Sequence, residues 1–566
     1  MRADDLLLVP RPRHLELHGD GPPLEAAIDE QRVGDLPAEG YKLDITADSI
    51  RLRHGDDAGL RYGRATLDQL RAQSSSRLPA LSIRDHPDFA VRGYMLDISR
   101  DRVPTRATLE RLVELMALAR VNQFQLYMEH TFAYADHEVV WRDASPMTPD
   151  DLRWLDGHCA DRGIELVANQ NTFGHMGRWL AHPEYRDRAY APDGLELLPG
   201  ITMPPGVLAP TPENAAFALG LLDELLPNFG SRRVHVGCDE TFELDDADAY
   251  LAHLHRLMGP LVDAGYQVQF WADVARHDPA LVARIPRGSV PVVWSYEAPQ
   301  PASAWPDLPP EIVAVLDRLG IDADFIAGFA RLVPPFADAR APFWVAPGTS
   351  SWNSLVGRVD NARANLVDAA EVGLARGAGG YLVTDWGDNG HLQPPPVSFG
   401  PLLYGGAVSW CLEANRDLDL AAALDRFVFA TPGTGAMLDE LGRLWDRTGQ
   451  TAFNASPLQA ALCPTQLHLI VGEPDPAAVV AVIESLEWAV SSLDEPSLRN
   501  AARLARHGAW RLLARAGGPA PDRDTLRTDL REAIAEYEDC WHAWSRPGGL
   551  RESRAQLETT LATYDE

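Results

Sequence analysis

The sequence predicts an α/β protein in which a (β/α)8 barrel follows a small α+β domain and precedes a helical C-terminal region. Residues 1–85 alternate between strand and turn patterns before a helical segment, residues 86–412 contain eight short apolar runs, and residues 413–566 have helical periodicity. These three ranges are the predicted domains. The chain has 566 residues, of which 46% are hydrophobic, so it can bury a sizeable core.

The first 85 residues have the pattern of a small mixed domain. Residues 14–17 and 41–45 alternate apolar and polar side chains, which indicates strands with one buried face. From about residue 57 the apolar residues recur at steps of three and four, which predicts a helix. The tripeptide Asp-His-Pro at 85–87 then separates this unit from the next one.

Eight runs rich in Val, Leu, Ile and aromatic residues recur between residues 86 and 412. Each run ends in polar or aromatic residues and is followed by a longer segment, and 108–120 and 362–376 have helical patterns. Continuous apolar runs are typical of parallel strands that helices cover. Eight such units predict a TIM barrel with insertions, whose functional residues lie where the strands end. The predicted strands are 94–99, 124–129, 165–170, 234–240, 267–273, 291–296, 343–349 and 381–388.

The C-terminal region has the signals of several helices. Asp475 followed by Pro476 predicts an N-cap and the first turn of a helix over 477–493. Pro496 and the glycine pair at 517–518 bracket a second helix. A third helix carries one apolar face, for which core packing is favoured over ligand contact, made of Leu526, Leu530, Ile534, Tyr537, Trp541 and Trp544.

Charge and cysteine content exclude several classes of function. The chain has 51 basic and 81 acidic side chains, and its net charge of −30 repels nucleic acid and anionic membrane surfaces. The five cysteines are scattered and form no Cys-x-x-Cys pair, so a reducing compartment fits. The apolar run at 6–9 is too short for a signal peptide, and prolines interrupt the uncharged stretch at 392–412. We therefore expect a cytoplasmic protein without a membrane segment, and a homodimer is one assembly consistent with the sequence.

The residues at the ends of the predicted strands form an unusual set. Tryptophan faces stack on the C–H faces of sugar rings, while carboxylates and arginine form hydrogen bonds with sugar hydroxyls. A purely structural barrel would not gather such residues at one rim, so the set predicts a carbohydrate site. It includes Arg100, Glu129, His130, Asn169, Gln170, Asn171, His175, Asp239, Glu240, Trp271, Asp273, Trp294, Tyr296, Ser350, Ser351, Trp352, Asn353, Trp386 and Asp388.

One pair of adjacent carboxylates stands apart within this set. The dipeptide Asp-Glu occurs six times in the chain, so composition alone gives it no meaning. Only Asp239-Glu240 closes a buried strand pattern, where a charge pair has no structural purpose. Adjacent carboxylates favour one proton held on the pair. A protonated carboxyl beside an ionised one is what acid-assisted glycosidic cleavage requires.

Three segments also match motifs of a known family. Residues 235–240 read His-Val-Gly-Cys-Asp-Glu, residues 92–100 read Arg-Gly-Tyr-Met-Leu-Asp-Ile-Ser-Arg, and residues 39–70 lie within the small mixed domain. The first matches the signature His-x-Gly-x-Asp-Glu of glycoside hydrolase family 20, the β-N-acetylhexosaminidases. The second resembles that family's first strand, Arg-Gly-x-x-x-Asp-x-x-Arg, and the third is similar to the domain that precedes its barrel. The resemblance covers residues from about 1 to 412.

The resemblance implies a substrate-assisted retaining mechanism without metal or cofactor. The 2-acetamido oxygen of the substrate attacks the anomeric carbon, and an oxazolinium intermediate forms. By position, Glu240 would be the general acid and base, and Asp239 would orient the acetamido N–H and stabilise the developing positive charge. His175 and Glu129 resemble the family's Asp–His relay, with Glu in place of Asp.

The same resemblance assigns the substrate-binding residues. Arg100 would bind the 3- and 4-hydroxyls and Asp388 the outer hydroxyls, and the pocket walls would be Trp271, Trp294 and Trp386. The family's acetamido-binding tyrosine has no clear counterpart after the seventh strand. Either Tyr296 or Tyr127 could take that role, or Trp352 could reshape the wall, and Asn353 is a further candidate for substrate binding.

Several alternatives remain open at this point. His130, His175 and His235 with Glu129 could be imagined as metal ligands, but no His-x-His or His-x-x-x-His spacing supports this, so no metal is expected. The leading interpretation is an exo-acting β-N-acetylhexosaminidase acting on small glycans. A retaining glycosidase with a protein nucleophile, acting on sugars without an acetamido group, is the second. A catalytically silent sugar-binding protein is the third, although such a protein needs no acid.

Overall fold

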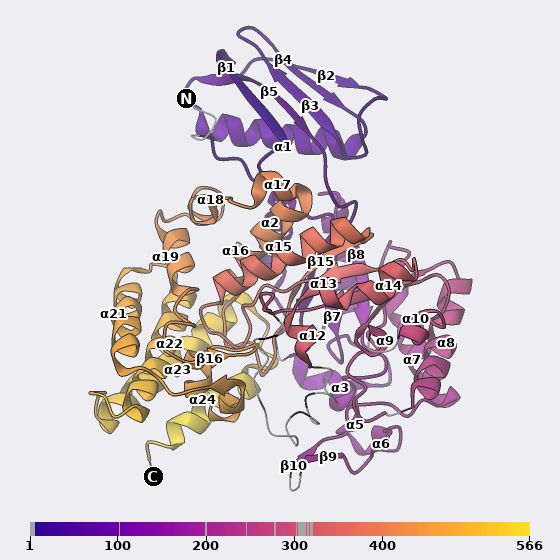
Figure 1. The fold of residues 1–566 in the computed structure, drawn as a ribbon, viewed down its shortest axis with the longest axis vertical. Helices are drawn as coiled ribbons and strands as arrows, with labels where there is room; N and C mark the ends of the chain where they lie inside the picture. The colour runs from indigo at the N-terminus through magenta and orange to yellow at the C-terminus, as the bar shows by residue number, and fades with distance from the viewer. Residues whose placement is uncertain are drawn as a thin grey trace.

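The computed structural model describes residues 6–100, 102–198, 201–244, 246–276, 279–301, 303, 313, 316 and 321–565. Figure 1 shows an N-terminal sheet domain, a barrel surrounded by helices, and C-terminal helices that lie against the barrel. The predicted architecture, a (β/α)8 barrel between a small α+β domain and a helical region, is confirmed. The first predicted boundary lies between β5 (Arg77–Asp85) and β6 (Arg92–Asp97), and the second lies at the start of α17 (Leu412–Asn415).

The N-terminal domain is a five-stranded sheet with one helix on its face. Asp56 caps the helix by accepting a hydrogen bond from the Gly59 backbone N–H at 2.8 Å. Trp410 of the barrel region belongs to the same apolar core, and buried Arg120 pairs with Asp85 at 2.6 Å. These contacts join the domain to the barrel. In sheet order the strands are β1 (His14–Pro23), β5 (Arg77–Asp85), β3 (Tyr41–Ile45), β4 (Ile50–His54) and β2 (Ile28–Arg32), and the helix is α1 (Asp57–Gln73).

Eight parallel strands close the barrel, and each lies within or overlaps one of the eight predicted runs. The strands follow the chain order around the barrel, and pairing of β8 with β11 is part of the closed ring. They are β6 (Arg92–Asp97), β7 (Gln123–Met128), β8 (Glu165–Gln170), β11 (Arg233–His235), β12 (Gln267–Trp271), β13 (Ser289–Trp294), β14 (Trp344–Ala346) and β15 (Gly380–Asp385).

The fourth barrel strand is shorter than the sequence predicts. The run at 234–240 leaves the strand after His235, because Gly237, Cys238 and Glu240 adopt left-handed backbone angles with φ of 73°, 70° and 50°. A side chain at Gly237 would meet Asn171 atoms at 2.3 Å, so the close approach of β8 and β11 requires glycine there. The motif at 235–240 therefore forms a tight turn that carries both carboxylates.

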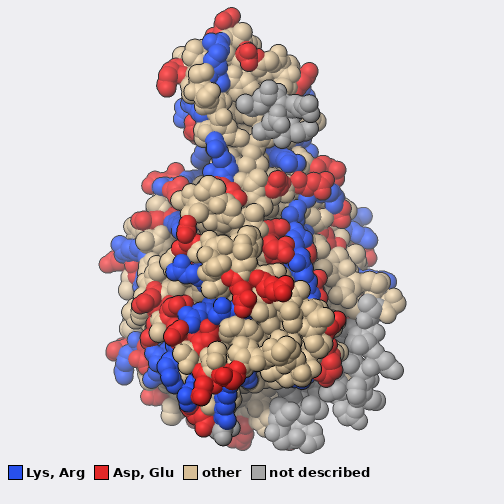
Figure 2. Space-filling view, turned by 90° about the vertical axis from the view of Figure 1, so that its left-hand side faces the viewer, with Lys and Arg blue, Asp and Glu red and all other residues tan. Residues whose placement is uncertain are grey.

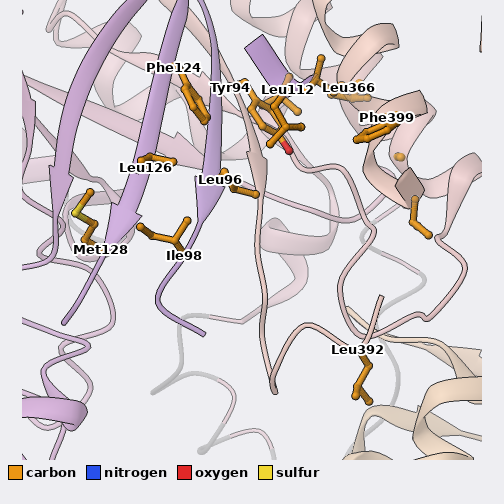
Figure 3. Packing of buried hydrophobic residues seen from close by; sticks show 14 of the residues in the cluster. Tyr94, Leu96, Ile98, Leu112, Phe124, Leu126, Met128, Leu366, Leu392 and Phe399 are labelled. Atoms are coloured by element: carbon orange, nitrogen blue, oxygen red, sulfur yellow. The ribbon is translucent and has the colours of Figure 1, made fainter. Parts of the chain in front are cut away.

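Helices pack on the outside of the barrel. The predicted helices at 108–120 and 362–376 are α2 (Arg106–Leu118) and α15 (Val359–Arg376). Figure 3 shows outward-facing side chains of β6 and β7, among them Tyr94 and Phe124, near Leu112, Leu366 and Phe399 of the covering helices. The other long helices here are α4 (Pro149–Ala160), α7 (Pro212–Leu225), α8 (Ala247–Asp263) and α16 (Phe399–Trp410).

The C-terminal region is helical and packs beside the barrel. The predicted N-cap is confirmed, since the Asp475 side chain accepts from the Ala477 backbone N–H at 2.9 Å. All six residues of the predicted apolar face on α23 are buried. The longest helices are α21 (Pro476–Ser492), α22 (Pro496–Arg515), α23 (Arg523–Trp544) and α24 (Leu550–Ala562), and a small sheet joins β16 (Thr451–Ala452) to β17 (Ile470–Val471).

Surface charge follows the composition. On the face in Figure 2, acidic and basic side chains are interspersed and no broad basic area is visible. A long helix apolar enough to cross a membrane does not occur in the described part of the chain.

Candidate active site

A cavity of about 480 Å³ lies at the carboxyl ends of the barrel strands. It brings together eight of the residues that the sequence analysis proposed, namely Arg100, His175, Asp239, Glu240, Trp294, Tyr296, Trp386 and Asp388. The other lining residues are Phe242, Glu297, Ile321, Phe325, Asn389, Phe453 and Asn454. The wall therefore combines charged groups with aromatic faces, as a sugar site requires.

The two adjacent carboxylates are held by neighbouring strand ends. Asn171, which follows β8, donates from Nδ2 to Asp239 Oδ1 at 2.7 Å. The Glu240 backbone N–H donates to Asp273 Oδ2 at 2.8 Å, which fixes the left-handed turn at Glu240. Burial opposes ionisation of Asp239, but His175 and Asn171 outweigh it and lower the pKa of Asp239 below its usual value. Asp239 is therefore held in its ionised form.

His175 bridges both carboxylates. Its Nε2 lies 3.3 Å from Asp239 Oδ2 and 3.1 Å from Glu240 Oε2. Burial alone would lower the pKa of His175, yet the two carboxylates raise it well above its usual value. On its other side, Nδ1 lies 3.8 Å from Glu129 Oε1, which is longer than a hydrogen bond. The proposed relay residues are thus neighbours, with an ionic contact between them.

Arg100 connects this group to the far side of the cavity. Its guanidinium donates from Nη1 to Asp97 Oδ2 at 3.0 Å, and its Nε lies 3.5 Å from Glu129 Oε1. The guanidinium carbon also lies 5.3 Å and 5.2 Å from the ring centroids of Tyr127 and Trp386. These contacts hold Arg100 in one orientation toward the cavity.

Two further carboxyl groups retain protons more readily than usual. Burial, with the nearby negative charge of Asp239, raises the pKa of Asp273 to about 7. Burial also raises the pKa of Asp388 to about 6, although Arg100 opposes the shift. Asp273 lies directly behind the tight turn at 235–240, since it accepts the Glu240 N–H.

Three proposed substrate-binding residues lie behind the cavity wall. Trp271 is fully buried, with its ring centroid 4.3 Å from that of His235. Trp352 is 1% exposed and meets the Tyr296 ring edge-on at 5.3 Å. Asn353 is also buried, and its Nδ2 donates to the Asn454 carbonyl at 3.1 Å. These three side chains pack behind the residues that line the cavity. Their direct contact with substrate stays a prediction.

Two of the three histidines considered as metal ligands, His130 and His235, are buried and neutral. Burial lowers the pKa values of His130 and His235 to about 3. In the described ranges, no three His, Cys, Asp or Glu side chains are grouped so that they could hold a metal ion.

Comparisons with known proteins agree with this geometry. Residues 6–86 match a family model described as glycosyl hydrolase family 20, domain 2, and residues 89–258 match the catalytic domain of the same family. These two regions, which together make up less than half of the chain, are therefore similar to two domains of glycosyl hydrolase family 20. The second match spans the first four barrel strands and includes Arg100, Glu129, His175, Asp239 and Glu240.

Relatives in this family cover part of the chain. A beta-hexosaminidase of Akkermansia muciniphila is 27% identical over 263 residues, which are 41% of this chain and 51% of that protein. A beta-N-acetylhexosaminidase of Cellulomonas fimi is 23% identical over 397 residues, which are 57% of this chain and 78% of that protein. The chain thus spans about half the length of the first of these relatives, and only 19% of a lacto-N-biosidase of Bifidobacterium bifidum.

Solved family 20 structures share the fold. The exo β-N-acetylglucosaminidase of Vibrio harveyi, in complex with N-acetylglucosamine, has a TM-score of 0.55 at 16% identity, over 77% of this chain and 78% of that one. The chitobiase of Flavobacterium johnsoniae has a TM-score of 0.53 at 15% identity, over 96% of this chain and all of that one, 100%.

The C-terminal region supplies lining residues that the sequence analysis missed. Phe453 and Asn454 follow β16 and reach the cavity, where Asn454 N–H donates to Glu297 Oε1 at 2.8 Å. Glu297 is itself paired with Arg358 inside the protein. No motif marks residues 453–454 in the sequence, because their position depends on packing between regions far apart in the chain. Glu297 had a weak signal, since it directly follows Tyr296 at a strand end.

Proposed function

We propose that the protein is an exo-acting β-N-acetylhexosaminidase that releases terminal β-linked N-acetylglucosamine or N-acetylgalactosamine by substrate-assisted catalysis. One observation carries the proposal: Asp239 and Glu240 lie 3.3 Å and 3.1 Å from the same imidazole nitrogen of His175, beside a polar and aromatic cavity. The names of the family 20 relatives, beta-hexosaminidase and beta-N-acetylhexosaminidase, support the same activity.

The exposure of the two carboxylates supports a division of roles between them. The Glu240 side chain is 35% exposed, whereas that of Asp239 is 7% exposed. A general acid must reach the glycosidic oxygen on the open side, and the exposed Glu240 is placed for this. Buried, ionised Asp239 is suited to accept from the acetamido N–H and to stabilise positive charge on the cyclising group.

The reaction then proceeds in two steps. In the first, Glu240 gives its proton to the leaving oxygen while the glycosidic C–O bond breaks and the acetamido oxygen bonds to the anomeric carbon. In the second, Glu240 takes a proton from water, whose oxygen attacks the anomeric carbon and releases the acetamido oxygen. Glu240 ends the cycle protonated, and the configuration of the sugar is retained.

Tyr296 is the better candidate of the two tyrosines for holding the acetamido oxygen. Its ring lines the cavity, and burial raises its pKa well above its usual value, so the hydroxyl stays a donor. The Tyr127 hydroxyl instead donates to Glu129 Oε1 at 3.1 Å and accepts from Asn171 at 3.2 Å. A donor from the end of β13 would thus replace the one that the family places after the seventh strand.

A panel of aryl β-glycosides tests the proposed activity. We expect hydrolysis of 4-nitrophenyl N-acetyl-β-glucosaminide and N-acetyl-β-galactosaminide, with much lower kcat/KM for the matched glucoside and galactoside. A thiazoline analogue of the cyclised intermediate should inhibit far more strongly than the free sugar, because it resembles the transition state. Comparable rates on sugars without the acetamido group would favour the protein-nucleophile alternative. Binding of the thiazoline without turnover of any glycoside would favour a silent sugar-binding protein.

The compartment is a separate proposal. We infer a cytoplasmic location, supported by five free cysteines, of which Cys159, Cys238, Cys411 and Cys463 are buried. Fractionation of source cells with activity measured in each fraction tests it, and enrichment outside the cytoplasm would overturn it.

A further inference from the structure

Asn454 is one of the residues by which the C-terminal region is attached to the rim of the cavity. Its backbone N–H donates to Glu297 Oε1 at 2.8 Å, and its carbonyl accepts from Asn353 Nδ2 at 3.1 Å. The backbone is left-handed, with φ of 49°, a conformation that Asn adopts more readily than most residues. Both partners lie at barrel strand ends, so the residue is held by the barrel although it belongs to another region.

The contact with Trp352 sets the orientation of the Asn454 side-chain amide. Trp352 Nε1 lies 2.8 Å from Asn454 Oδ1. An indole N–H can only donate, so the atom facing it must be the amide oxygen, and the amide nitrogen must lie on the other side. Asn454 is half-buried and lines the cavity, and its Nδ2 has no hydrogen bond to a described residue. The residue thus offers the cavity a donor in a fixed direction.

A chain of amides extends from Asn454 toward Asp388. Because Asn353 Nδ2 faces the Asn454 carbonyl, Asn353 Oδ1 is left to accept, and Asn389 Nδ2 donates to it at 3.2 Å. Asn389 directly follows Asp388, and both line the cavity. Asn454 therefore belongs to the part of the rim that carries Asp388. The part of the rim where the leaving group departs is a different one, formed by Glu240 and Phe242.

We propose that Asn454 binds the C6 hydroxyl of the terminal sugar and so makes the C-terminal region part of the sugar-binding site. The inference rests on the proposed function and is made by elimination. The anomeric oxygen faces Glu240, the 2-acetamido group faces Asp239, and Arg100 with Asp388 takes the ring hydroxyls. The hydroxymethyl group is the remaining polar group of the sugar, and the free amide of Asn454 lies on the corresponding rim. Glu297 is less available, since it is engaged by Arg358 and by the Asn454 N–H.

The test compares 4-nitrophenyl N-acetyl-β-glucosaminide with its 6-deoxy analogue. The parent enzyme should prefer the 6-hydroxy substrate in kcat/KM by about threefold to tenfold, the range for one uncharged hydrogen bond at a partly open site. Asn454→Gly tolerates the left-handed backbone and keeps both main-chain bonds, but should bring the ratio close to one. Asn454→Ser shortens the side chain and removes the amide nitrogen that faces the cavity, so it should also lose the preference. Asn454→Asp retains two polar atoms and should restore it, since the hydroxyl can donate to the carboxylate.

Thr451→Gly is the matched control, because it introduces glycine at an exposed position of the same segment. It should keep the parental ratio. Two results overturn the inference while leaving the proposed function intact. One is equal kcat/KM of the parent enzyme for the 6-hydroxy and 6-deoxy substrates. The other is a folded Asn454→Gly or Asn454→Ser enzyme that keeps the parental preference for the 6-hydroxy substrate. A parent that cleaves glucosides but no N-acetyl substrate refutes the proposed function itself.

Discussion

The buried carboxyl group of Asp273 should make the stability of the folded protein depend on pH, in a direction and by an amount that follow from its raised pKa. Its pKa is raised from 3.8 to about 7 because it is buried beside the negative charge of Asp239, although the hydrogen bond that it accepts from the Glu240 N–H opposes the shift. A carboxyl whose pKa is raised on folding binds its proton more tightly in the folded state. The contribution of Asp273 to the free energy of unfolding is therefore most favourable below pH 3.8, and it becomes less favourable as the pH rises toward 7.

Asp273→Asn should remove this penalty while it keeps an oxygen for the Glu240 N–H. Each pH unit between the unfolded and folded pKa values costs up to about 1.4 kcal/mol, so the parent loses up to about 4 kcal/mol across the window relative to the variant. The variant should accordingly gain stability over the parent as the pH rises from 4 to 7, and the difference should be constant above about pH 8.

Denaturant unfolding of both proteins at pH 4, 5, 6, 7 and 8 measures this difference. Asp48→Asn is the control, since Asp48 is exposed on the N-terminal domain and should show no such trend. If the difference in the free energy of unfolding between the parent and Asp273→Asn does not change with pH, the argument that Asp273 is held protonated behind the turn at 235–240 is refuted.

Two predictions concern the groups around the reacting atoms. Glu240→Gln keeps the shape of the side chain but removes the transferable proton, so hydrolysis of unactivated disaccharides should slow by about 10²–10⁴. Cleavage of aryl glycosides with good leaving groups should slow less, because they depend less on that proton. A parental rate on disaccharides would mean that Glu240 is misassigned. Tyr296→Phe removes one donor at the acetamido oxygen and should lower kcat for N-acetyl substrates by about 10²–10³, with the fold checked by thermal unfolding. An unchanged kcat in that variant would exclude Tyr296 from this role.

The barrel is predictable from the sequence because its strands are buried on both faces. Each of the eight apolar runs corresponds to a strand, since parallel strands covered by helices leave little choice but continuous apolar residues. Strand ends are less predictable. The run at 234–240 has no charged carboxylate before Asp239, yet the strand stops at His235, because the turn that presents Asp239 and Glu240 needs left-handed residues.

The site is predictable only where chemistry leaves a local signal. Asp239, Glu240, His175 and Arg100 end strands or follow them closely, so position and residue type together indicate the cavity. Tryptophans carry less information, because an aromatic side chain at a strand end suits both a sugar and the core. Trp271 lies behind the cavity wall, whereas Trp294 and Trp386 form it.

Lining residues from another region cannot be read from the sequence at all. Asn454 reaches the cavity through contacts with residues about one hundred positions earlier, such as Trp352 and Asn353, and no periodicity records those contacts. Ser553 of α24 does not line the cavity, but its contact is equally unpredictable: its hydroxyl donates to the Gly390 carbonyl at 2.5 Å and supports the loop that carries Asp388.

The central claim is that the substrate's acetamido oxygen, and no carboxylate of the protein, attacks the anomeric carbon. Intact-protein mass spectrometry during turnover of a slow fluorinated N-acetylglycoside tests it directly, with peptide mapping to locate any label. The account predicts unmodified protein and an oxazoline in solution or bound in the site, because Asp239 serves only to orient the acetamido group. A glycosyl ester on Asp239, or on any other carboxylate of the cavity, would contradict it.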